Sequence, residues 1–166
     1  MDITAVNRII EVLTKEALLY EEMLALSKNK TNIIVNGKVS ELENITKLEQ
    51  TMILKLSKLE DDREELAGKL AVDLGLKPAE ITLGGLISRL PEKLANELEG
   101  CRKKLPAILN KLKESNSLNS RLIKNSLDYI NFSINILSSV GPSDNNYVNS
   151  GEAISSKSRN FFDMKL

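Results

Sequence analysis

Only one glycine, Gly37, and no proline occur in the first 67 residues of this 166-residue chain. Glycine and proline are the residues that most often interrupt helices, so a stretch this long with a single one of them favours long helices. Its apolar residues recur every three or four positions, the spacing that places them along one side of a helix. They are Ile3, Val6, Ile10, Leu13, Ala17, Tyr20 and Leu24. We therefore expect a helix that runs to about Asn36 and ends at a left-handed residue, Gly37.

A second helix is expected directly after Gly37. Ser40 is followed by Glu43, which is the spacing of a capping box, so this helix is predicted to begin at Ser40. Its inward-facing positions continue the same spacing: Ile45, Glu49, Met52, Leu56, Leu59, Arg63, Leu66 and Leu70. Because a short turn joins the two helices, they are expected to pack side by side in antiparallel orientation.

The second helix is expected to end near Gly75 and Pro78, which stand close together in the sequence. Thr82 is then a suitable N-cap for a short helix of two turns. Pro91 suits the first turn of the next helix, where its missing N–H is not needed. The middle of the chain is therefore predicted to be a short helical insert between two long helices.

A third long helix is predicted from Pro91 to about Ser139. Its apolar positions are Leu94, Leu98, Cys101, Leu105, Ile108, Leu112, Leu122, Tyr129 and Ile136. Pro106 lies inside this stretch, and an interior proline costs about 3 kcal/mol of helix stability. We therefore expect a bend or a break near residues 102–106.

The helix lengths decide between a compact globule and a bundle. At 1.5 Å per residue the first helix alone would be about 50 Å long, whereas a compact chain of this size has a radius of gyration of about 15 Å. The sequence therefore predicts an all-α fold for residues 1–140, an elongated antiparallel bundle or coiled coil of three long helices plus a short helix. Residues 141–166 are rich in Gly, Ser and Asn and are predicted to form a flexible C-terminal tail.

The composition excludes several classes of function. The chain has no histidine, one cysteine, and 23 basic residues balanced by 23 acidic ones. Without histidine there is no Ser/His/Asp or Cys/His pair, and a lone Cys101 cannot build a thiolate zinc site. Zero net charge argues against a nucleic-acid partner. The first eight residues lack the basic-then-apolar layout of a signal peptide, and no apolar run approaches the length of about 18 residues that a membrane span needs. We expect a cytoplasmic protein that is not an enzyme, uses no metal or cofactor and does not insert into membranes.

The segment of residues 118–137 carries more apolar side chains than one packing seam requires. They are Leu118, Leu122, Ile123, Leu127, Tyr129, Ile130, Phe132, Ile134, Ile136 and Leu137. Fully burying each such side chain contributes about 1.5–3 kcal/mol, so several left exposed would strongly favour binding to a partner. An amphipathic helix of another protein would cover them. The alternative is that the bundle core or a homodimer does so.

Aromatic side chains in the tail form a second candidate site. Tyr147, Phe161 and Phe162 stand in otherwise polar sequence. Aromatic residues in flexible segments often serve as anchors that dock on a partner. The alternative is that these rings fold back on the bundle or bind nothing.

Several of these segments, in this order, resemble the FlgN family of flagellar type III export chaperones. The similar segments are LLYEEMLAL (residues 18–26), VNGKV (35–39), LENITKLEQ (42–50), ITLGGLI (81–87), NSLNSRLI (116–123), SLDYINF (126–132), Gly141-Pro142, Tyr147 and FDMK (162–165). The resemblance implies a cytoplasmic chaperone without ATPase activity. Such a chaperone binds the C-terminal helical segments of the hook-filament junction proteins FlgK and FlgL, prevents their premature assembly and delivers them to the export gate protein FlhA.

The resemblance also implies two sites. The substrate contacts of the family match residues 118–137, and its gate-docking tyrosine, in a Tyr-x-x-x-Gly stretch, matches Tyr147 and Gly151. Three other readings stay open. The first is a structural coiled-coil adaptor or homodimer, the second is a chaperone for another flagellar protein (FliT-like), and the third is a carboxylate-based enzyme, which the missing histidine disfavours.

Overall fold

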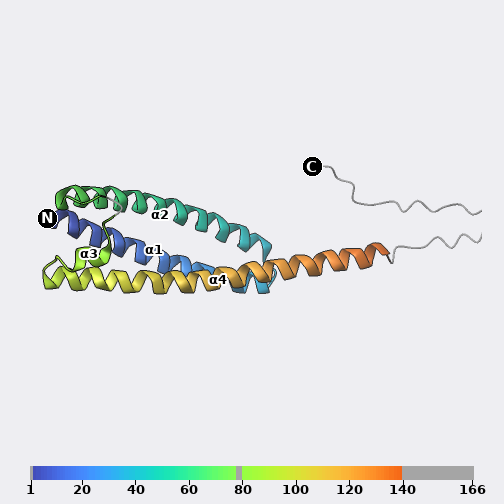
Figure 1. Ribbon diagram of the computed structural model, residues 1–166. Coiled ribbons are helices and arrows are strands. Elements are labelled where there is room, and N and C mark those ends of the chain that lie inside the picture. Colours follow the sequence, from blue (N-terminus) through green and yellow to red (C-terminus); the bar gives the residue numbers. More distant parts are fainter. Residues whose placement is uncertain (1, 78–79, 140–166) are drawn as a thin grey trace, which may run out of the picture. The chain divides into compact units, whose positions relative to one another are not determined.

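The computed structural model describes residues 2–77 and 80–139. Most of these residues are in helices. The helices are α1 (Ile3–Val35), α2 (Val39–Leu74), α3 (Leu83–Ile87) and α4 (Glu92–Ser139), and the described residues contain no strand (Figure 1). The predicted all-α fold, with three long helices and one short one forming a bundle, is confirmed. By its internal contacts the chain divides into two units, residues 1–130 and 131–166. The predicted tail, with Tyr147, lies outside the described residues.

Local hydrogen bonds explain where α1 begins and ends. The side chain of Asp2 caps its first turn by accepting a hydrogen bond from the backbone N–H of Thr4 at 2.8 Å. At the other end Gly37 has a φ of 65°, as predicted, and the N–H of Lys38 reaches back to the carbonyl of Ile33. This pattern satisfies the last carbonyls of the helix and reverses the chain within a few residues.

The start of α2 differs from the prediction. The helix begins at Val39 and its N-cap is Lys38, which makes no side-chain capping bond. The predicted capping box of Ser40 and Glu43 was therefore wrong. The turn after Gly37 is so tight that the carbonyl of Lys38 already accepts the first helical bond, from Leu42, before Ser40 is reached.

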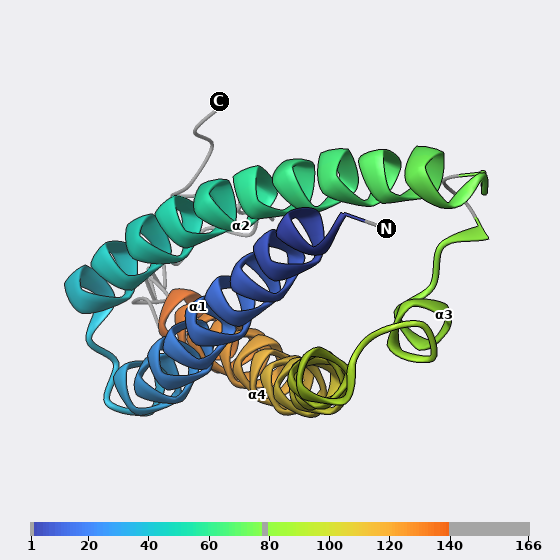
Figure 2. The ribbon, with the colours of Figure 1, turned by 90° about the vertical axis from the view of Figure 1, so that its left-hand side faces the viewer.

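In both views α1 lies between α2 and α4; α2 runs in the opposite direction to α1, and α4 runs in the same direction as α1 (Figures 1 and 2). Two ion pairs join α1 to α2, Lys30 with Glu49 at 2.7 Å and Arg63 with Glu16 at 3.1 Å. On each helix the paired residues are fourteen positions apart (16 to 30, and 49 to 63), so α1 and α2 are antiparallel and in constant register.

The apolar core lies at the end of the bundle that holds α3 and the start of α4. Its buried members are Ala5, Val6, Ile9, Val12, Leu13, Leu66, Leu70, Leu86 and Leu98. Because α1 packs against helices on two sides, it buries more than the one stripe that the sequence predicted. Leu19 lies between stripe positions and is buried, whereas Ile3, in the first turn, is exposed.

The insert and the third long helix begin as predicted. Thr82 caps α3 by accepting a hydrogen bond from the N–H of Gly85 at 3.0 Å, and the carbonyl of Pro91 accepts the first bond of α4. However, α4 continues through Pro106 without a break. Both Pro106 and Arg102, whose carbonyl loses its partner there, are exposed. Water can satisfy that carbonyl, so the missing bond does not end the helix.

No described helix is long and apolar enough to cross a membrane.

Candidate functional site

The C-terminal half of α4 is attached to α1 by a network of polar side chains. Asn119 is 3% exposed, and its Nδ2 donates a hydrogen bond to the backbone carbonyl of Ser27 at 2.8 Å. The hydroxyl of Thr31 donates to Oδ1 of Asn119 at 2.6 Å. Ser27 Oγ in turn donates to Oδ1 of Asn116 at 2.8 Å and lies 2.8 Å from Ser115 Oγ.

This network also orients α1 and α4 relative to one another. Ser27 pairs with Ser115 and Thr31 pairs with Asn119, so α1 and α4 run parallel at this level. Every buried polar side-chain atom of the described residues has a partner. A satisfied polar network inside a helix interface disfavours shifted pairings, because any shift would leave buried groups without partners. It therefore fixes which side of α4 faces outward between residues 119 and 130.

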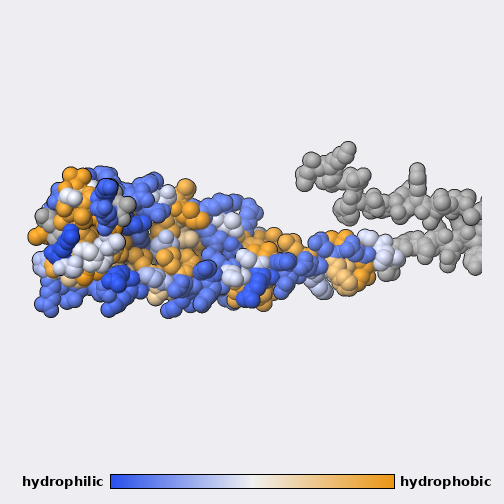
Figure 3. Space-filling view, in the orientation of Figure 1, coloured by the Kyte–Doolittle hydropathy of each residue, from blue (hydrophilic) through white to orange (hydrophobic). Residues whose placement is uncertain are grey.

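Most of the apolar residues predicted as a binding surface in this part of α4 are exposed. Within residues 1–130, Leu118, Leu127, Tyr129 and Ile130 are exposed, with Tyr129 at 72% and Leu127 at 54%. Leu122 and Ile123 are half-buried instead. The bundle core thus covers only part of the segment, and a hydrophobic surface remains around the end of the bundle where α1 turns into α2 (Figure 3).

The described part of the second unit, residues 131–139, is also rich in exposed apolar side chains. Phe132, Ile134, Ile136 and Leu137 are all exposed, Leu137 at 73%. They belong to the same helix, α4, which runs without interruption to Ser139.

Two of the hollows beside α4 within residues 1–130 are lined by its half-buried residues, one by Leu122 and the other by Ile123. The first, which we call the turn groove, has a volume of about 560 Å³ and is lined by both the α1–α2 turn and α4. Its residues are Ile34, Val35, Asn36, Gly37, Leu122, Asn125, Ser126, Tyr129 and Ile130. It is wide and mostly open, so an incoming apolar side chain could pack against Leu122 and Ile34 there.

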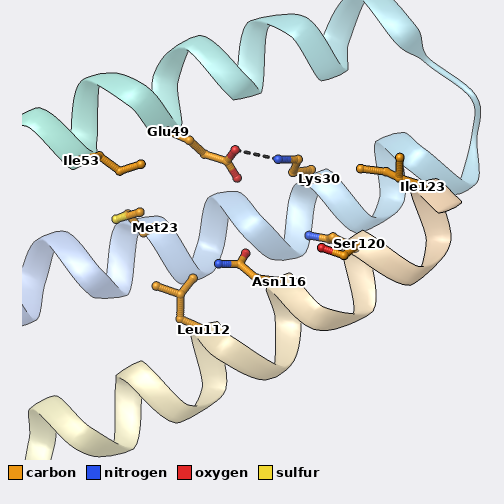
Figure 4. Close-up of a pocket in the computed structure, with 9 residues that line it drawn as sticks. Met23, Lys30, Glu49, Ile53, Leu112, Asn116, Ser120 and Ile123 are labelled. Carbon is orange, nitrogen blue, oxygen red and sulfur yellow. Dashed lines mark hydrogen bonds and ion pairs between the residues drawn. The ribbon is translucent and has the colours of Figure 1, made fainter.

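The second hollow, the central cavity, has a volume of about 190 Å³ and lies where all three long helices meet (Figure 4). Its lining residues are Met23, Lys30, Glu49, Ile53, Leu112, Asn116, Asn119, Ser120 and Ile123. The Lys30–Glu49 ion pair bridges α1 and α2 beside it, and both side chains are less than one-fifth exposed. Within residues 2–77 and 80–139, no three Cys, Asp or Glu side chains gather as metal ligands would.

The polar network was not predicted, although the sequence carries a signal for it. The apolar stripe of the third helix has a gap between Leu112 and Leu122, and Asn116 and Asn119 fill that gap at the expected spacing. Likewise Ser27 and Thr31 continue the stripe of the first helix after Leu24. Polar residues at consecutive inward positions of two helices indicate a polar layer between them.

Comparison with known proteins identifies the family. The model of the FlgN protein family matches residues 1–154. The uncharacterized protein YvyG of Bacillus subtilis strain 168 is 32% identical over 139 residues, which cover 84% of this chain and 82% of the relative. No solved structure matches the chain. The chain therefore belongs to the FlgN family, a family of chaperones rather than of enzymes, and this membership implies a role in flagellar export.

Proposed function

We propose that this protein is a cytoplasmic chaperone that binds the C-terminal helical segments of the hook-filament junction proteins FlgK and FlgL. Binding would prevent their premature assembly and keep them competent for type III export. The main support for this proposal is that apolar side chains of α4 are exposed. The chain also belongs to the FlgN family. We call the exposed residues Leu118, Leu127, Tyr129, Ile130, Phe132, Ile134, Ile136 and Leu137 the α4 apolar surface.

Physical arguments support an amphipathic helix as the occupant. Each apolar side chain that becomes fully buried contributes about 1.5–3 kcal/mol, and this surface presents several on one helix. An amphipathic helix offers its own apolar side chains at a matching spacing and keeps its polar side in water. The polar network at Ser27 and Asn119 holds the first part of this surface in place before a partner arrives, which lowers the ordering cost of binding.

Delivery is the second part of the proposal. Tyr147 would dock on the export gate protein FlhA, in keeping with the Tyr-x-x-x-Gly pattern that ends at Gly151. A tyrosine brings a large contact area with few rotatable bonds, which suits a short docking segment. Capture and delivery would then use different residues. Tyr147→Ala is expected to weaken FlhA binding and leave FlgK and FlgL binding unchanged, and loss of both would contradict this separation.

The experiment is co-purification of the chain with FlgK and FlgL from the same organism. The double variant Leu127→Asp/Ile130→Asp should abolish co-purification, because charges on this surface cannot be buried. Leu54→Asp/Val72→Asp is the matched control, since both residues are exposed apolar side chains on α2, and it should behave like the wild type. Far-UV circular dichroism must show equal helicity in both variants. Retained co-purification of the α4 variant would refute the proposal.

The same apolar surface also favours a second candidate, a homodimer without an export role. Two copies could cover their α4 apolar surfaces against each other, as apolar faces of helices commonly do. The mass in solution separates the two functions. A dimer whose mass does not change with dilution, combined with no affinity for FlgK or FlgL, would favour the homodimer.

A further inference from the structure

The neutral net charge of the chain hides an uneven charge distribution. From Met23 to Lys38 the sequence holds three lysines and no acidic residue. In α4, residues 105–127 hold four basic residues and only one acidic residue, Glu114. These two segments pack on each other through the network of Ser27 and Asn119. Lys30 and Lys38 are paired with Glu49 and Glu41 of α2, so the unpaired positive charge of this region comes from Lys28 and from the basic residues of α4.

Part of this positive charge surrounds a groove between α1 and α4, which we call the basic groove. It is lined by Lys28, Thr31, Asn32, Lys111, Glu114, Ser115, Leu118 and Arg121. It is distinct from the central cavity and the turn groove, with which it shares no lining residue. Three cationic side chains, one carboxylate and one partly exposed leucine therefore face the same open space.

The cations of the basic groove form no ion pair with any other described residue. Elsewhere in the bundle, lysines are paired within their own helix, as Lys15 is with Glu11, or across helices, as Lys104 is with Glu21. No ion pair within residues 2–77 and 80–139 involves Lys28, Lys111 or Arg121, and all three side chains are exposed. Clustered cations without partners create a positive potential that attracts an anionic partner.

We propose that the basic groove binds an acidic amphipathic helix of a partner protein, with its carboxylates on Lys28, Lys111 and Arg121 and an apolar side chain on Leu118. The groove runs between two parallel helices, which is the position that an additional helix occupies in a bundle. Arg121 can receive a carboxylate in a bidentate geometry, whereas the two lysines act as point charges. The basic groove shares Leu118 with the α4 apolar surface, but its preference for carboxylates comes from Lys28, Lys111 and Arg121, which are not part of that surface.

The groove composition favours a protein segment over a nucleic acid. Proteins that bind single-stranded nucleic acids commonly supply aromatic side chains on which bases stack, and no aromatic residue lines the groove. Glu114 would also repel a phosphate backbone, whereas a helix of mixed sequence can place a polar residue beside it. Leu118 offers apolar contact area that only a partner with apolar side chains can use.

The test uses the full chain and two labelled synthetic peptides of about 20 residues, long enough for a helix of about 30 Å. Both peptides carry leucine at helical spacing, and the positions flanking the leucines are Glu in one peptide and Gln in the other. By fluorescence anisotropy at low salt, the Glu peptide should bind about tenfold more tightly than the Gln peptide. The difference should shrink as salt is added, because exposed charges are screened.

Two triple variants with the same change in net charge provide the control. Lys28→Glu/Lys111→Glu/Arg121→Glu should abolish the preference for the Glu peptide. Lys55→Glu/Lys58→Glu/Lys93→Glu, at exposed positions outside the groove, should retain most of it. Equal binding of the two peptides, or equal loss in both variants, would overturn the proposal. Displacement of the Glu peptide by an equal concentration of single-stranded DNA would also overturn it, in favour of a phosphate-binding surface.

Discussion

Asn119 on α4 donates a hydrogen bond from its side-chain Nδ2 to the backbone carbonyl of Ser27 on α1, at 2.8 Å. Both residues are almost completely buried. Different interactions therefore join α1 to α4 at the two ends of the bundle. At the α3 end α1 and α4 share the apolar core that includes Val6 and Leu98, whereas at the other end they are joined by side-chain amides and hydroxyls. The second kind of interface is more specific in geometry than the first and contributes less per residue to stability.

Asn119→Ala is expected to destabilise the chain by about 1–3 kcal/mol, because the Ser27 carbonyl and the Thr31 hydroxyl lose a buried partner. Urea unfolding followed by circular dichroism measures the change. Asn125→Ala is the control, since Asn125 lies on the same helix and is exposed, and it should change the free energy of unfolding by less than about 0.5 kcal/mol. Equal effects of the two substitutions would show that the buried network has no special role.

Glu49→Gln is expected to cost about 1–3 kcal/mol of unfolding free energy, since it leaves the ammonium group of Lys30 beside the central cavity without its carboxylate. The double variant Lys30→Met/Glu49→Leu should recover most of this loss by replacing both charges with apolar groups. Glu43→Gln removes the exposed Lys47–Glu43 pair and should cost less than about 1 kcal/mol. A double variant no more stable than Glu49→Gln would contradict the assignment of the cost to an unpaired charge.

Two glycines with different backbone conformations should respond in opposite directions to alanine. Gly37 has a φ of 65°, so Gly37→Ala is expected to cost about 1 kcal/mol. Gly68 lies inside α2 with open space where a Cβ would stand, so Gly68→Ala should stabilise the chain by about 0.5–1 kcal/mol. Thermal unfolding of the two variants compares them directly, and a shift of the melting temperature in the same direction for both would contradict the structure.

The free energy of unfolding should depend on Tyr20 at alkaline pH. Burial, and then the negative charges of Glu16 and Glu60, raise the pKa of Tyr20 above its usual value. The folded state therefore holds the phenol proton more tightly than the unfolded state does. The resulting stability is complete below a pH of about 10 and is lost as the pH rises through the pKa of the folded state.

The variant Tyr20→Phe isolates this effect. Urea unfolding of the wild type and of Tyr20→Phe at a series of alkaline pH values should show that the wild type loses stability more steeply. Other titrating groups are common to both proteins and cancel in the difference. Parallel curves for the two proteins above a pH of about 10 would contradict the raised pKa.

Local signals in the sequence predicted the long helices well. The left-handed conformation of Gly37 was predictable because it depends on that residue and its neighbours in the sequence. The N-cap at Thr82 was predictable because a capping bond involves residues only three positions apart. The prediction of a capping box at Ser40 was wrong because the turn after Gly37 is tight enough to begin the helix at Val39, with Lys38 as its N-cap. The predicted break at Pro106 did not occur because Arg102, whose carbonyl loses its helical partner, is exposed to solvent. That exposure depends on how the whole helix packs.

The candidate site was only partly predictable for a similar reason. The apolar excess of residues 118–137 is a composition signal, and the exposure of Leu127 and Ile130 agrees with it. Leu122 and Ile123 are half-buried because of where α1 ends beside α4. Local sequence patterns do not predict that position. The pairing of Ser27 with Asn119 joins residues far apart in the chain, so the sequence marks both as polar interruptions without showing that they meet.

Hydrogen–deuterium exchange of the full chain, with and without the C-terminal segment of FlgL, tests the central claim most directly. Capture by the α4 apolar surface should slow exchange in residues 118–139, because binding excludes water and suppresses local opening of the helix. Exchange in α2 around Leu54, which is also exposed and apolar, should not change. Protection of α2 without protection of residues 118–139 would contradict the claim that α4 receives the export substrate.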